Sequence, residues 1–137
     1  MLAKKHEVPD EILLDTFFTP SDESQGAGRK FLTRLRARTV NRDVDVGPGV
    51  IPAQVAAFAA WGVPSADSSR YLKTLTRPAL VVSGSNDLIH YTINSYNLSQ
   101  NIPGAELIIY PDSAHGSIYQ YPDQFLKDAT AFLDRSN

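Results

Sequence analysis

An aspartate at position 87 and a histidine at position 115 of this 137-residue chain form a candidate pair for acid–base chemistry. An imidazole with a pKa of about 6.5 can take a proton from a hydroxyl group and return it to a leaving group near neutral pH. A carboxylate on the second ring nitrogen fixes the tautomer and stabilises the imidazolium that forms. We therefore expect His115 to be a general base and Asp87 to be the acid that orients it.

Each of the two residues follows a short apolar run that is typical of a β-strand. The runs are 79–83 and 107–110, and a segment of helical length, 91–101, lies between them. A strand, a helix and a second strand form a βαβ unit, and a parallel sheet gathers the loops after its strands at one edge. We therefore expect neighbouring parallel strands that bring Asp87 and His115 within hydrogen-bonding reach.

Other roles for these and nearby residues stay open. Asp87 would cap the following helix, and His115 would be an ordinary polar loop residue. His90 lies close enough to Asp87 to share a metal ion with it, but no third ligand follows, so no metal site is expected. Four serines near the pair could hydrogen-bond there or replace a nucleophile, although none stands at a strand-to-helix turn. They are Ser83, Ser85, Ser113 and Ser117.

The region 77–133 resembles the last part of an α/β-hydrolase. In that family one strand runs into a Gly-x-x-Asp loop, and here residues 84–87 read Gly-Ser-Asn-Asp. A later strand runs into a loop histidine followed by a helix, and here residues 113–116 read Ser-Ala-His-Gly. The family's triad also has its acid before its histidine. The resemblance implies that Asp87 and His115 are the acid and the histidine of a catalytic triad.

The nucleophile of that triad has no counterpart. The family's Gly-x-Ser-x-Gly motif does not occur in the chain, nor does a Gly-x-Asp-x-Gly version, and there is no cysteine. The resemblance implies a serine-type hydrolase that acts on an ester or similar acyl bond of a small molecule, without a cofactor. We expect the chain to be inactive alone. The alternatives are a non-catalytic interaction module and one half of a split hydrolase. A cofactor-free haloperoxidase or a C–C bond hydrolase would use the same acid and histidine.

The first part of the chain, residues 1–76, resembles the helical lid that such enzymes insert before the acid-bearing strand. Helices are expected over 9–18, 21–38 and 53–61, with a loop over 41–52. Residues 77–137 are expected to form the C-terminal part of the core, so the fold class is α/β, a helical lid followed by a partial parallel sheet. Four lid aromatics are expected to pack on the core or to line an acyl pocket, and four residues of the last helix to belong to the core. The first set is Phe17, Phe18, Phe58 and Trp61; the second is Phe125, Ala129, Phe132 and Leu133.

Composition limits the function classes. The chain is 42% hydrophobic with a formal net charge of −2, so it has no general attraction for nucleic acid or anionic lipid. Basic residues gather at 29–42 and indicate a solvated helix face, or an anion-binding patch centred on Arg34 and Arg38. No apolar stretch approaches the roughly 20 residues of a membrane helix, and without cysteines a cytoplasmic setting is expected. Because two parallel strands leave an open edge, we expect a homo-oligomer or a partner chain.

Overall fold

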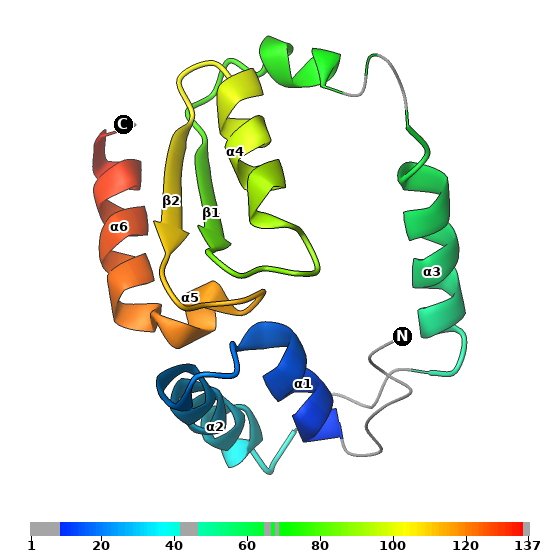
Figure 1. Cartoon of the computed structure of the whole chain (residues 1–137), viewed down its shortest axis with the longest axis vertical. Coiled ribbons are helices and arrows are strands. Elements are labelled where there is room, and N and C mark those ends of the chain that lie inside the picture. The colour runs from blue at the N-terminus through cyan, green and yellow to red at the C-terminus, as the bar shows by residue number, and fades with distance from the viewer. Residues whose placement is uncertain (1–8, 42–46, 65–66, 68, 136–137) are drawn as a thin grey trace.

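A computed structural model describes residues 9–41, 47–64, 67 and 69–135 (Figure 1). The order of elements is α1 (Pro9–Phe17), α2 (Asp22–Ala37), α3 (Val50–Trp61), the 3-10 helix η2 (Arg70–Thr74), β1 (Leu80–Gly84), α4 (Thr92–Asn101), β2 (Glu106–Tyr110), α5 (Ser117–Gln120) and α6 (Pro122–Arg135). Helices therefore precede a two-stranded sheet with a helix between its strands, which confirms the predicted α/β class.

The sheet is a parallel pair, as predicted. β1 and β2 run in register from Leu80 opposite Glu106 to Gly84 opposite Tyr110. Helix α4 packs on both strands, and α6 lies beside β2 in Figure 1. The hydroxyl of Tyr110 donates to Asp128 on α6 at 2.8 Å. Burial and that carboxylate raise the pKa of Tyr110 above its ordinary value. Among the described residues, neither strand has a partner on its outer edge.

Helices α1 and α2 pack closely at a glycine. A Cβ added at Gly28 would lie 2.5 Å from Leu14 and 2.8 Å from Phe18, so this position needs a residue without a side chain. Phe18 is only 2% exposed. The side chain of Ser21 caps α2 by accepting from the Ser24 amide at 3.1 Å. The hydroxyl of Thr19, two residues earlier, donates to Asp112.

Helix α3 starts three residues before the predicted helix. Pro52 stands in its first turn, where a missing N–H removes no intrahelical hydrogen bond, so the loop predicted over 41–52 was wrong for its last three residues. Part of that loop, 42–46, lies outside the described residues. All of α3 is exposed, with Phe58 at 64% and Trp61 at 80%. Figure 1 shows this helix standing apart from the other elements.

The last helix is less buried than expected. Leu133 is exposed, and Phe125, Ala129 and Phe132 are only half-buried. No residue of α6 is fully buried. The physical reason is the width of the sheet, because two strands cannot cover the whole apolar face of a helix of 14 residues. The placement of these four residues in the core was therefore wrong within this chain.

Candidate active site

Asp87 and His115 meet at the carboxyl ends of the two strands. The Nδ1 atom of His115 lies 2.9 Å from Oδ2 of Asp87. The carboxylate is 7% exposed, and the imidazole is half-buried. The predicted geometry of the pair is therefore confirmed, whereas the catalytic role of the two residues stays a prediction.

The second oxygen of Asp87 holds its own turn in place. Oδ1 accepts from the backbone amides of Ile89 and His90, each at 2.9 Å, just before α4 begins. The N-cap position of α4 is Tyr91, with no side-chain cap hydrogen bond, so Asp87 holds the turn before the helix and does not cap the helix itself. With both oxygens engaged, the carboxylate offers the imidazole a fixed acceptor.

Gly84 brings the end of β1 against the loop that carries His115. A Cβ at this glycine would lie 2.3 Å from the backbone oxygens of Ser113 and Ala114. The Asn86 amide donates to the Ser113 oxygen at 2.9 Å and closes the contact. Glycine at the end of a strand is also used for sharp turns that need a positive φ, and this is not the reason for Gly84. Its backbone φ is not in the left-handed range, so the actual reason for glycine is close approach.

Phe17 lies on the other side of the histidine loop. Its backbone oxygen accepts from the Gly116 amide at 2.9 Å, and its ring meets the His115 imidazole edge-on with centroids 5.7 Å apart. A Cβ at Gly116 would lie 2.6 Å from that of Phe17. Phe17 therefore fills the space beside the imidazole at Gly116.

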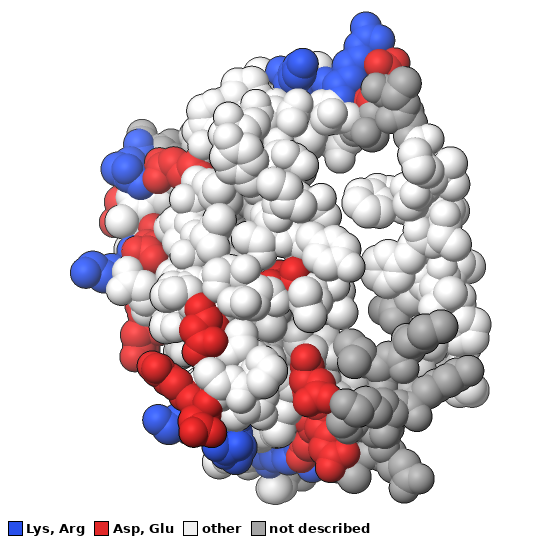
Figure 2. Space-filling view, viewed as in Figure 1, with Lys and Arg blue, Asp and Glu red and all other residues white. Residues whose placement is uncertain are grey.

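A pocket of about 840 Å³ adjoins the pair. Asp87 and His115 line it together with apolar side chains from several elements, among them Leu72, Val82 and Trp61. Figure 2 shows mostly uncharged side chains around the hollow between α3 and the rest of the chain. Among the described residues, Nε2 of His115 has no hydrogen-bond partner, so it is available to a hydroxyl group that enters from outside.

The other candidates near the pair are less engaged with it. The His90 ring lies edge-on to His115, with centroids 5.2 Å apart. In the described part of the chain no group of three His, Cys, Asp or Glu residues could hold a metal ion. The Ser83 and Ser113 hydroxyls donate to backbone oxygens, and the Ser85 hydroxyl donates to Asn86. Ser117 is buried in the pocket wall. No hydrogen bond joins any of these serines to His115 in the described ranges.

The basic residues at the end of α2 bond to other parts of the chain. Arg34 donates to the Tyr119 backbone oxygen at 3.4 Å, and Arg38 donates to that of Val40 at 3.2 Å. Arg36 pairs with Asp10 of α1. The anion-binding alternative for Arg34 and Arg38 stays a prediction.

No helix among the described residues is both long and apolar enough to cross a membrane.

Sequence reasoning missed Asp112, which joins α1 and α2 to the histidine loop. Its carboxylate accepts from the hydroxyl of Thr19 at 2.6 Å and from that of Ser21 at 2.5 Å. The hydrogen bond from Ser21, and then that from Thr19, holds the pKa of Asp112 below its usual value. Nothing local in the sequence signals this cluster, because aspartate, serine and threonine are ordinary loop residues.

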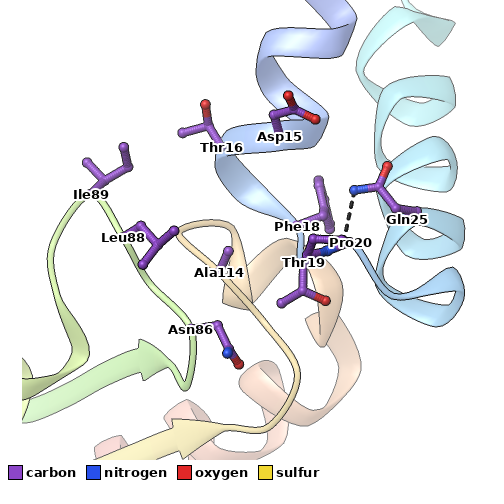
Figure 3. A pocket seen from close by; sticks show the side chains of 10 residues that line it. All are labelled: Asp15, Thr16, Phe18, Thr19, Pro20, Gln25, Asn86, Leu88, Ile89 and Ala114. Carbon is purple, nitrogen blue, oxygen red and sulfur yellow. Dashed lines mark hydrogen bonds between the residues drawn. The ribbon is translucent and has the colours of Figure 1, made fainter. Parts of the chain in front are cut away.

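A second pocket, of about 590 Å³, lies beside this cluster (Figure 3). It separates the end of α1 from the turn after β1. Phe18 and Thr19 line one side, whereas Leu88 and Ile89 line the other. The pocket does not include His115, so it is distinct from the one that adjoins the acid–histidine pair.

Comparison with known proteins gave matches among solved structures, whereas no family model and no curated protein matched. An α/β-hydrolase fold protein from Chitinophaga pinensis is 41% identical, with a TM-score of 0.88 over 96% of this chain and 47% of its own. A thermophilic esterase from Thermogutta terrifontis is 19% identical (TM-score 0.61, 98% of this chain, 48% of its own). An enol-lactonase from Burkholderia xenovorans LB400 is 24% identical (TM-score 0.58, 97% and 48%). The chain thus spans about half the length of these structures, and it belongs to the α/β-hydrolase fold family.

Proposed function

We propose that the chain supplies the acid and the histidine of a serine-type hydrolase, while the nucleophile lies on polypeptide outside these 137 residues. The observation that carries this proposal is the 2.9 Å contact between His115 and the nearly buried Asp87 at the ends of two parallel strands. Two of the matched structures are named as an esterase and an enol-lactonase. The substrate would be a small molecule with an ester or similar acyl bond.

In this mechanism Nε2 of His115 takes the proton of the serine hydroxyl while the serine oxygen attacks the acyl carbon. The Nδ1 proton stays hydrogen-bonded to Asp87, which stabilises the imidazolium that forms. His115 then gives its proton to the leaving alcohol, and a water molecule repeats the sequence to release the acid. One oxyanion donor in this family is the amide of the residue after the nucleophile and the other lies in an earlier loop, so both would come from outside the chain. No step needs a cofactor.

The pocket beside the pair supports an apolar acyl group. Leu72, Val81, Val82 and Leu98 line it, and Trp61 contributes from the end of α3. An acyl chain placed there would have its carbonyl carbon near His115. A large apolar pocket with a few polar groups at one end is the common form of a small-molecule site.

The test is complementation with the first half of the Chitinophaga pinensis protein, because its matching part is 41% identical to this chain. Hydrolysis of a short-chain aryl ester is measured for the chain alone and for the mixture. We expect no activity of the chain alone above that of free imidazole, and activity in the mixture that His115→Ala abolishes. Asp87→Asn should lower kcat by roughly 10⁴-fold, since an amide no longer holds the correct tautomer.

His90→Ala is the matched control, because this ring touches His115 without a side-chain bond to Asp87. It should leave most of the activity in place. Activity of the mixture that is indifferent to His115→Ala would overturn the proposal. His115-dependent turnover by the chain alone would mean that the nucleophile lies within it, and Ser85 and Ser117 would be the first to mutate.

A second candidate is an interaction module, or one half of a split hydrolase, that works by binding another chain. The observation in its favour is surface apolarity, namely the exposed α3 and the unpaired outer edge of β1 in the described sheet. An open reading frame immediately upstream that encodes Gly-x-Ser-x-Gly would favour a divided or longer hydrolase. The cytoplasmic setting is likewise a proposal, and cell fractionation tests it.

A further inference from the structure

We propose that Asp112 is a positioning residue for His115, because its carboxylate fastens the corner between α1 and α2 to the loop that carries the imidazole. The catalytic meaning of this inference rests on the proposed function. Its structural content does not, because the position of the imidazole can be measured without turnover.

The fastening is a set of short side-chain hydrogen bonds across distant parts of the chain. Oδ1 of Asp112 accepts from the Thr19 hydroxyl at 2.6 Å, and Oδ2 accepts from the Ser21 hydroxyl at 2.5 Å. Hydrogen bonds to a charged acceptor are shorter and stronger than those between neutral groups. Each oxygen of one carboxylate therefore holds a different residue of the corner.

A second layer closes the network behind Asp112. The Ser24 hydroxyl, which is fully buried, accepts from the Thr19 amide at 2.8 Å and donates to Gln120 at 2.7 Å. The amide nitrogen of Gln120 donates to the backbone oxygen of Asp112 at 2.8 Å. Gln25 adds a bond to the Thr19 oxygen, drawn as a dashed line in Figure 3. A polar network whose members are all paired in this way fixes one arrangement of the segments that it joins.

The network acts on the imidazole through Phe17. Phe17 lies immediately before the fastened corner, and its backbone oxygen holds the amide of Gly116, next to His115. Its ring forms the wall on one face of the imidazole. Asp87 restrains the imidazole at Nδ1 only, and the His90 ring touches it edge-on, so loss of the Phe17 contact gives the ring more freedom to rotate or tilt about this hydrogen bond. Asp112 therefore acts on His115 through Phe17 and Gly116, without touching it.

The backbone at Asp112 guides the choice of variants. Its φ of 42° lies in the left-handed region, which aspartate, asparagine and glycine tolerate far better than other residues. Asp112→Gly removes the carboxylate without backbone strain. Asp112→Asn keeps one acceptor oxygen without the charge. Thr19→Val removes one donor and keeps the side-chain shape.

The experiment is NMR on the whole chain, and it has two readouts. One is the Nδ1 proton of His115, which reports the bond to Asp87, and the other is hydrogen exchange at the Gly116 amide. We expect Asp112→Gly to broaden the first signal and to speed the exchange at least tenfold. Thr19→Val should have a smaller effect, and Asp112→Asn should fall between the two.

Asp128→Asn is the matched control, because Asp128 also accepts a hydroxyl hydrogen bond but ties β2 to α6. It should leave both signals unchanged. The proposal is overturned if both signals are also unchanged in Asp112→Gly. If Asp112→Gly does not fold, Asp112→Asn and Thr19→Val decide by the same criterion.

The complemented enzyme gives a third readout. Asp112→Asn should lower kcat with little change in KM, since the substrate pocket is intact while the base is misaligned. A loss through instability would instead scale with the folded fraction at the assay temperature. If the NMR signals change while activity is indifferent to His115→Ala, the positioning role stands and the proposed function fails.

Discussion

The helical pair α1–α2 and the helix α3 precede the same sheet, yet in the described part of the chain only the pair packs against the segment after β2, through α5 and the histidine loop. Phe18, which follows α1, is buried. In the corner between α1 and α2, the Thr19 hydroxyl donates to Asp112 and the Phe17 oxygen accepts from the Gly116 amide. Helix α3 has no charged residue, and every one of its residues is exposed. The more apolar element is thus the one that does not pack. Packing here follows from shape at Gly28 and from polar partners, whereas apolarity alone does not select a docking site.

The largest expected difference in stability is between alanine variants of two phenylalanines, Phe18 and Phe58. Phe18→Ala should lower the free energy of unfolding by roughly 3–5 kcal/mol, because it empties a fully enclosed site. Phe58→Ala on α3 should change it by less than about 0.5 kcal/mol, since that ring is 64% exposed. Urea unfolding followed by circular dichroism measures both. Similar losses for the two variants would show that α3 packs as tightly as α1.

Two glycines of α2 sharpen the comparison within one helix. Gly28→Ala should destabilise the chain by about 1–3 kcal/mol, because the new methyl group would overlap Leu14 and Phe18. Gly26→Ala should stabilise it by about 0.5–1 kcal/mol, since nothing lies within 4 Å of that site and alanine favours a helix. The same urea titrations apply. A stabilising Gly28→Ala would mean that the pair is not closely packed there.

For α3 we propose a role in association. Sedimentation should show self-association of the purified chain, or binding to the complementing half, because an uncharged exposed helix and an open strand edge favour contact. Trp61→Ala should weaken it about tenfold or more, which is the order expected for a tryptophan at an interface. Lys30→Ala on exposed α2 surface is the control. A stable monomer at high concentration, with no affinity for the complementing half, would contradict this role.

The smallest expected effect is a pH dependence of the stability that Asp112 contributes by holding the corner of α1 and α2. Hydrogen bonds from Ser21 and Thr19 hold the pKa of Asp112 in the folded chain below its ordinary value. The stability that this carboxylate contributes is therefore present above its unfolded pKa of about 3.9 and is lost as pH falls through the lower folded value. Urea midpoints of the wild type and Asp112→Asn should differ most at about pH 6 and converge below about pH 4. A difference that does not shrink at all as pH falls below about 4 would argue against this origin.

The sequence predicted what depends on local patterns. Two apolar runs with a helical segment between them were enough to place Asp87 and His115 together, because each run ends a few residues before one of the two. The contacts of Asp112 could not be predicted from the sequence, because its two donors lie 93 and 91 positions away and no periodicity links them. The need for a glycine at position 84 could not be predicted either, since the backbone atoms that approach it belong to the distant histidine loop. Burial of α6 was overestimated because an apolar stripe does not reveal how wide the sheet beneath it is.

The separation in sequence between bonded residues also bears on the order of folding. Asp87 and His115 are 28 positions apart, whereas Thr19 and Asp112 are 93 apart. Closing the longer loop costs about 1 kcal/mol more in chain entropy. The strand pair can therefore form early with α4 as its local connection, and the corner of α1 and α2 closes onto it afterwards. His115 would reach its acid before it acquires the Phe17 wall, so the last contacts to form are those that set the orientation of the imidazole.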